Sequence, residues 1–211
     1  MHLDLIIDKK LHRFFIYDVL GIINNPIFDI EDIAQYLSRI YRYNNLTRRN
    51  YSVALHSVNM AGWYMYRYAE NKTEQERILD ILAILLHDCA EFIVGDLSKP
   101  IKDNAVKGFD KLEEHFKCWL VNGINLDYKT LFEDIGRVKL VNRCDYEIFQ
   151  QEALAFGVDF GDLREHHIKY EEAVSHREKF KLILAPENTD NVVSDTYVYL
   201  QWFKCSEALT I

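Results

Sequence analysis

The sequence lacks the features that would place the protein in a membrane, in the secretory pathway or on duplex nucleic acid. The 211 residues contain no uncharged apolar run of roughly 18 or more, so we expect no transmembrane helix. The N-terminus does not combine a basic stretch, an apolar core and a small-residue cleavage site, as a secretory signal peptide does. The formal net charge of −8 at pH 7 disfavours binding to a nucleic acid polymer, which needs a basic surface.

Cysteine pairs with C-x-x-C spacing are also absent. The four cysteines, at positions 89, 118, 144 and 205, lie far apart in the chain, which argues against a zinc ribbon or a thioredoxin motif. Four free thiols suit a reducing compartment. We therefore predict a cytoplasmic protein with no membrane partner.

Strand patterns and hairpin turn signals are weak, whereas apolar residues recur at helical spacing along most of the chain. The sequence thus predicts an all-α fold in one domain. Residues 1–28 are expected to form an N-terminal extension that packs on the core, and residues 29–211 the helical domain. The expected helices cover about 29–41, 52–69, 73–95, 106–122, 134–156 and 192–208.

The central feature is the pair His87-Asp88 at the end of the apolar run Ile81–Leu86. An unpaired carboxylate is costly to bury, so this pair must reach a solvated cleft or be neutralised by a cation. Glu91 follows four residues after His87, which places it on the same face of the expected helix, one turn further on. A divalent metal would neutralise the pair, and Glu91 adds a third polar group beside it.

Two further residues of the metal-binding type lie in other apolar helices. His56 interrupts the apolar stripe of the 52–69 segment, and Asp145 lies in the 134–156 segment. A lone histidine in such a stripe is usually a hydrogen-bonded core residue, but with His87 and Asp88 the set gives a mixed nitrogen and oxygen site suited to manganese, cobalt, iron or zinc. Such a metal would polarise a phosphoryl oxygen and activate water. Asp134 is the main alternative to Asp145.

The ordered set His56, His87-Asp88 and Asp145 on successive helices resembles the HD-domain metal-dependent phosphohydrolase superfamily. The stretches Ser52–Ser57, Leu85–Glu91 and Gly95–Lys102 resemble more narrowly the bacterial and phage HD-domain 5′-deoxynucleotidases. The resemblance covers roughly residues 29–156, and its core motifs lie between 42 and 152. The Gly-Asp-Leu-x-x-Pro-x-Lys element at its end makes the match more specific than a His-Asp dipeptide alone.

The resemblance implies an HD-domain helical bundle that binds one divalent metal through His56, His87, Asp88 and Asp145. It implies that Glu91 and Asp96 manage proton transfers during hydrolysis of a deoxynucleoside monophosphate. Nucleotide contacts are implied for four residues, namely Arg42, Tyr43, Asp96 and Lys102. Relatives form dimers or larger rings, so the resemblance also implies a homo-oligomer.

Two alternatives stay open at this level. Related phage proteins share the same core and cleave dATP, so a deoxynucleoside triphosphohydrolase is the second candidate. Tyr43 stands where relatives often carry tryptophan, and this leaves the discrimination between deoxyribose and ribose open. A catalytically silent HD module that senses a nucleotide or binds a partner is the third candidate, but the intact ligand set and Glu91 favour an enzyme.

Overall fold

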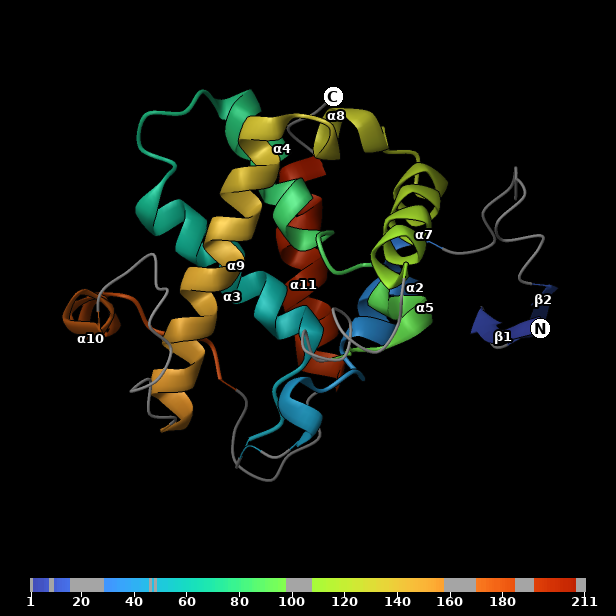
Figure 1. Ribbon diagram of the computed structural model, residues 1–211, viewed down its shortest axis with the longest axis horizontal. Helices are drawn as coiled ribbons and strands as arrows, with labels where there is room; N and C mark the ends of the chain where they lie inside the picture. Colours follow the sequence, from blue (N-terminus) through green and yellow to red (C-terminus); the bar gives the residue numbers. More distant parts are fainter. Residues whose placement is uncertain are drawn as a thin grey trace.

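The computed structural model describes residues 2–7, 10–15, 29–45, 47, 49–97, 108–157, 170–184 and 192–207. Most of these residues are helical, which confirms the all-α class (Figure 1). The helices are α2 (Ile30–Leu37), α3 (Val53–Arg67), α4 (Glu74–Leu85), α5 (Glu91–Val94), α7 (Phe109–Gly123), α8 (Tyr128–Phe132), α9 (Ile135–Phe156), α10 (Tyr170–Lys179) and α11 (Val192–Glu207), with a 3₁₀ turn η1 (Arg42–Asn45) after α2.

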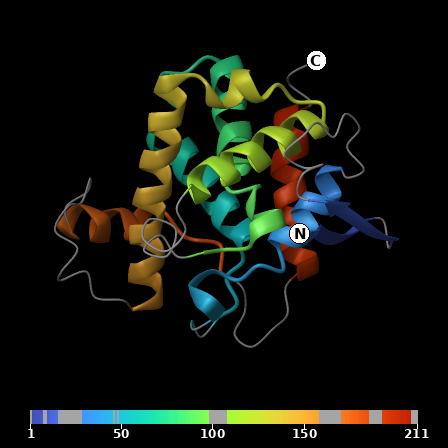
Figure 2. The ribbon, with the colours of Figure 1, turned by 45° about the vertical axis from the view of Figure 1, so that its right-hand side comes forward.

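The helix α11, the last of the described elements, is a central packing partner in the helical body. It packs against α2, α3 and α4, and α3 in turn packs against α4 and α9 (Figure 1). The view in Figure 2 shows the same arrangement, with α11 behind α7. Tyr199 and Phe203 are fully buried and lie four residues apart, on one face of α11. They join Trp63, Tyr64 and Leu82 in the main hydrophobic core.

Side-chain caps fix the helix starts that matter for the site. Ser52 caps α3 by accepting a hydrogen bond from the Leu55 amide at 3.1 Å, and it donates its hydroxyl to Asp195 of α11 at 2.5 Å. Asp134 caps α9 by accepting from the Arg137 amide at 2.7 Å. This contact gives Asp134, the alternative metal ligand, a structural role at the start of a helix.

An antiparallel hairpin at the N-terminus was not predicted. The strands β1 (His2–Ile7) and β2 (Lys10–Phe15) pair with His2 opposite Phe15 and Ile7 opposite Lys10, at the edge of the molecule (Figure 1). The alternation in Leu3-Asp4-Leu5 is too short to separate a strand from a helix by periodicity. The expectation that no strand occurs was therefore wrong for this segment. Among the described residues, no helix has the length and apolar character needed to cross a bilayer.

The expected helix over 73–95 is two helices, since α4 ends at Leu85 and α5 begins at Glu91. The reason is competition for two backbone carbonyls. The His87 ring nitrogen Nδ1 donates to the Ile84 carbonyl at 2.7 Å, and the Tyr199 hydroxyl donates to the Leu85 carbonyl at 2.6 Å. The amides that follow turn to carbonyls three residues back, for example Cys89 to Leu86 at 3.1 Å.

Candidate metal centre

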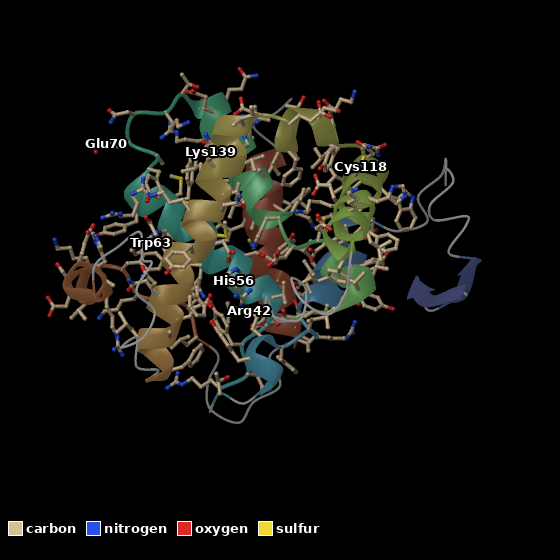
Figure 3. All side chains as sticks on the ribbon, in the orientation of Figure 1. Arg42, His56, Trp63, Glu70, Cys118 and Lys139 are labelled. Atoms are coloured by element: carbon tan, nitrogen blue, oxygen red, sulfur yellow. The ribbon has the colours of Figure 1, made fainter. Side chains whose placement is uncertain are left out.

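Three of the four predicted metal ligands meet between α3 and the turn that separates α4 from α5. His56 lies in the first turn of α3 and is fully buried, while His87 and Asp88 lie in the turn. One ligand atom from each of these three residues lies within 4.8 Å of the other two. We call His56, His87 and Asp88 the candidate metal cluster. Figure 3 shows His56 at the centre of the molecule, close to Arg42.

The fourth predicted ligand, Asp145, adjoins the cluster through His56. Its Oδ1 atom lies 3.1 Å from His56 Nε2, and Asp88 Oδ2 lies 3.0 Å from His87 Nε2. Asp145 is the most open of the four, with 45% of its side-chain surface exposed, which leaves that side of the cluster accessible to solvent. Of the two aspartates weighed from sequence, Asp145 lies beside His56, whereas Asp134 caps the start of α9.

Both imidazoles are oriented by hydrogen bonds from the ring nitrogen that faces away from the cluster. His87 Nδ1 donates to the Ile84 carbonyl, and His56 Nδ1 donates to Glu152 Oε1 at 2.5 Å. With Nδ1 committed to these acceptors, the Nε2 atom of each ring faces a carboxylate. Both Nε2 atoms are buried, and neither contact with a carboxylate has hydrogen-bond geometry. This is the arrangement expected of imidazoles that ligate a cation through Nε2.

The donor set fits a divalent transition metal. Two imidazole nitrogens and two carboxylate oxygens suit manganese, cobalt, iron or zinc, whose ligand bonds are about 2 Å long. Donor atoms within 4.8 Å of one another need only small shifts to surround one such ion. The structure thus brings together the residues that the sequence predicted for metal binding.

Burial and charge pull the protonation of these groups in opposite directions. Burial opposes ionisation of Asp88, but the neighbouring His87 holds the pKa of that carboxyl well below its usual range. Burial and Arg42 lower the pKa of His56, but Glu152 and Asp145 outweigh them and raise it to about 9. Burial likewise opposes ionisation of Glu152, and His56 and Arg42 nevertheless keep its pKa below the ordinary value. The centre is therefore a compact set of alternating charges.

Arg42, in η1, lies beside this set. Its Nη1 atom is 3.7 Å from Asp88 Oδ2, and its Nε atom is 3.7 Å from Glu152 Oε2. The Arg42 amide donates to the Tyr51 carbonyl at 2.8 Å, which fixes the turn against the start of α3. The arginine predicted to contact the nucleotide thus reaches the cluster from a separate element.

Tyr43, the second residue of the predicted nucleotide contact, has a strained backbone. Its φ of 58° lies in the left-handed region, which costs a bulky residue about 1–3 kcal/mol. The hydroxyl donates to Glu152 Oε2 at 2.5 Å, and the ring packs edge-on against Phe156 at 5.7 Å between centroids. These contacts hold a conformation that the local sequence would not choose.

The remaining predicted residues are placed less fully. Glu91 begins α5, is 3% exposed, and its amide donates to the Asp88 carbonyl at 2.9 Å, so it lies one short turn from the cluster. Asp96 is partly buried in the irregular segment after α5. It directly follows Gly95 in the chain, whose φ is 73°. Lys102 lies outside the described residues.

Glu152 is a member of the centre that we did not assign a role from sequence. It lies seven residues after Asp145, two helical turns along the same face of α9, and it is fully buried. A glutamate at a core-facing position of an apolar helix was the available signal, because buried carboxylates need partners.

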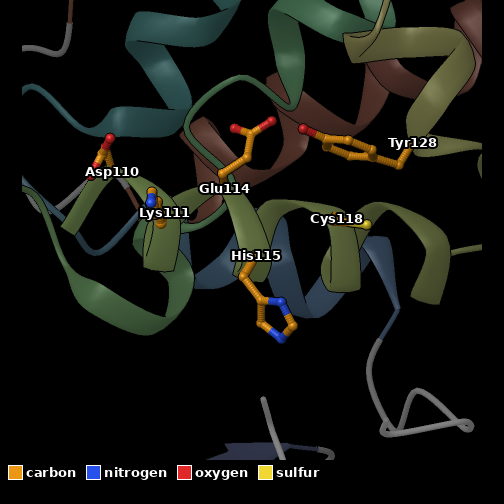
Figure 4. A pocket seen from close by; sticks show the side chains of 6 residues that line it. All are labelled: Asp110, Lys111, Glu114, His115, Cys118 and Tyr128. Carbon is orange, nitrogen blue, oxygen red and sulfur yellow. The ribbon is translucent and has the colours of Figure 1, made fainter. Parts of the chain in front are cut away.

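A hollow of about 570 Å³ lies over α7 and α8, away from the candidate metal cluster, and has no comparable chemistry. It is lined by Asp110, Lys111, Glu114, His115, Cys118 and Tyr128. In Figure 4 the Glu114 and Tyr128 side chains lie on one side of α7, whereas the His115 ring points to the other. The polar groups of this hollow therefore do not converge on a point.

Comparisons with known proteins give no functional name. No protein-family model matches the chain. An uncharacterized protein of Rhodobacter capsulatus is 36% identical over 88 residues, which is 41% of this chain and 42% of that protein. The match thus covers less than half of the length of this relative.

Proposed function

We propose that the protein is a metal-dependent nucleotide phosphohydrolase, and specifically a 5′-deoxynucleotidase that converts a deoxynucleoside monophosphate and water to deoxynucleoside and phosphate. The observation that carries the proposal is the guanidinium of Arg42 beside the candidate metal cluster, 3.7 Å from Asp88 Oδ2. A cation held by imidazoles and carboxylates, next to a guanidinium, favours a dianionic phosphate, because both positive groups attract oxygens of the same phosphoryl group.

The proposed roles follow from the family resemblance, and the position of Arg42 beside the candidate metal cluster supports its role. When bound, a divalent ion (cobalt, manganese, zinc or iron) would polarise a phosphoryl oxygen and lower the pKa of water at the site. Arg42 would hold phosphate oxygens with its planar fork of donors. Glu91, buried one turn after Asp88, would accept a proton from the attacking water or deliver one to the 5′ oxygen of the leaving deoxynucleoside. Asp96 would share this task beside the sugar.

The experiment is a product analysis of purified protein with manganese or cobalt. Panels of deoxynucleoside monophosphates, nucleoside monophosphates and deoxynucleoside triphosphates would be incubated and the products separated by chromatography. We expect inorganic phosphate from the deoxynucleoside monophosphates only, abolished by a chelator and unchanged in Asp134→Asn, where a helix cap and no ligand is altered.

Two other results would redirect the proposal. Release of intact triphosphate would identify a deoxynucleoside triphosphohydrolase, the second candidate, with the same metal ligands. Metal and nucleotide binding without any product would refute an enzyme and favour a nucleotide-sensing module. Size-exclusion chromatography with light scattering of the same preparation would test the expected homo-oligomer.

A further inference from the structure

Glu152 contacts both the candidate metal cluster, through His56, and the predicted nucleotide-binding pair Arg42 and Tyr43. Its fully buried carboxylate accepts hydrogen bonds from His56 Nδ1 at 2.5 Å and from the Tyr51 hydroxyl at 2.8 Å, both on Oε1. Its other oxygen, Oε2, accepts from the Tyr43 hydroxyl at 2.5 Å and lies 3.7 Å from Arg42 Nε. One oxygen thus serves a metal ligand, and the other serves the pair expected to contact the nucleotide.

This division of the carboxylate fixes its orientation. Tyr51 is itself held, because Asn59 Nδ2 donates to its hydroxyl at 2.9 Å. Glu152 therefore cannot rotate without losing hydrogen bonds on both oxygens. Because His56 Nδ1 is committed to Glu152, the ring turns Nε2 toward the cluster.

We propose that Glu152 is a positioning residue that holds His56 in its metal-binding orientation and ties it to Tyr43 and Arg42. The metal part of this inference needs only that the cluster binds a divalent ion. The part that concerns the nucleotide rests on the proposed function. Through Glu152, a change at Tyr43 alters the hydrogen bonding of a metal ligand, so metal affinity should respond to Tyr43 even when no nucleotide is present.

The same helix offers a matched control. Glu147 of α9 is also fully buried, and it accepts hydrogen bonds from Trp63 Nε1 at 2.8 Å, from the Tyr68 hydroxyl at 2.6 Å and from Arg143 Nε at 2.9 Å. All of its hydrogen bonds in the described part of the chain go to residues outside the cluster. Glu147→Gln therefore removes an equally buried, hydrogen-bonded charge without touching a ligand.

The experiment compares cobalt binding by the wild-type full chain, Glu152→Gln and Glu147→Gln. A glutamine presents a donor where the carboxylate presents an acceptor, so it cannot accept from His56, Tyr51 and Tyr43 together. We expect Glu152→Gln to weaken Co²⁺ binding about 10- to 100-fold and to alter the visible absorption of the bound ion, since this replacement removes the negative charge of the group that orients a ligating histidine. Glu147→Gln should keep the wild-type affinity and spectrum.

A second pair of variants, with milder substitutions, keeps the test valid if Glu152→Gln does not fold. Tyr43→Phe removes one donor to Glu152, and Tyr68→Phe removes one donor to Glu147. We expect weaker Co²⁺ binding in Tyr43→Phe and unchanged binding in Tyr68→Phe. Equal Co²⁺ affinities within each pair would overturn the inference.

The outcome separates this inference from the proposed function. Wild-type protein that binds Co²⁺ but hydrolyses no nucleotide would refute the nucleotidase and leave the comparison of the two glutamates decisive. Wild-type protein that binds no divalent ion would overturn both.

Discussion

Replacement of Asp88 by asparagine should abolish the stabilisation of the protein by metal while leaving the fold intact. The substitution keeps the shape of the side chain and removes its negative charge. That charge lies 3.0 Å from His87 Nε2 and 3.7 Å from Arg42 Nη1, and 22% of the side chain is exposed. The variant therefore loses a ligand of the candidate metal cluster without opening a cavity.

The size of the effect follows from linkage between binding and folding. At a free metal concentration about 100 times the dissociation constant, binding stabilises the folded state by about 2.7 kcal/mol. In a domain of this size each kcal/mol raises Tm by about 2–4 °C, so the wild-type Tm should rise by about 5–10 °C.

In the variant a neutral amide replaces a charged ligand. Loss of even an outer partner of a ligand weakens metal binding about 10- to 100-fold, so loss of a direct ligand should weaken it by at least about 100-fold. At the same metal concentration the variant would gain at most about 0.4 kcal/mol, or less than about 2 °C in Tm.

Differential scanning fluorimetry with and without manganese or cobalt measures this difference directly. Asp134→Asn is the control, because asparagine and aspartate cap helices about equally well and Asp134 contacts the first turn of α9. It should retain the full metal-dependent shift. If Asp88→Asn shifted as much as the wild type did, Asp88 would not be a ligand and the assignment of the cluster would fail.

Three further predictions concern protonation and packing. Although burial lowers it, contact with Glu152 raises the pKa of His56 to about 9, so below that pH a metal ion must displace a proton. Apparent metal affinity should therefore rise by up to about tenfold per pH unit between neutral pH and pH 9; an affinity that stays flat in calorimetric titrations contradicts this. Trp63→Phe removes the indole donor to buried Glu147 and should destabilise the protein by about 1–3 kcal/mol in urea unfolding. Tyr199→Phe removes the donor to the Leu85 carbonyl and should destabilise the protein by a similar amount. It should also weaken metal binding in part, and this loss distinguishes it from Trp63→Phe.

The helical class and the boundaries of the long helices were predictable from sequence. The expected 52–69 and 134–156 segments match α3 and α9 closely, because an apolar stripe and a capping residue mark each of them. The meeting of His56 with His87 and Asp88 was anticipated from motif order. The helices depend on residues that are close in sequence, where periodicity and caps carry the information, whereas the meeting of the ligands was expected from the family resemblance.

The break between α4 and α5 could not be predicted, because it depends on a distant residue. A continuous helix would bond the Leu85 carbonyl to the Cys89 amide, but Tyr199 takes that carbonyl from 114 residues away. The role of Glu152 was missed for a similar reason. Its partners Tyr43 and Tyr51 lie 109 and 101 residues earlier, and no local pattern links them.

The helix α11 therefore belongs to the centre even though it carries none of the predicted ligands. Tyr199 holds the carbonyl whose release from α4 allows the chain to turn at His87 and Asp88. Asp195 accepts from Ser52, the N-cap of α3, which lies four residues before His56. The two segments that bear the candidate metal cluster are thus fixed by hydrogen bonds with one face of α11, at sequence separations of 114 and 143 residues. Because these bonds are long-range, the geometry of the centre can form only when α11 has docked, so metal binding should report on the completed fold.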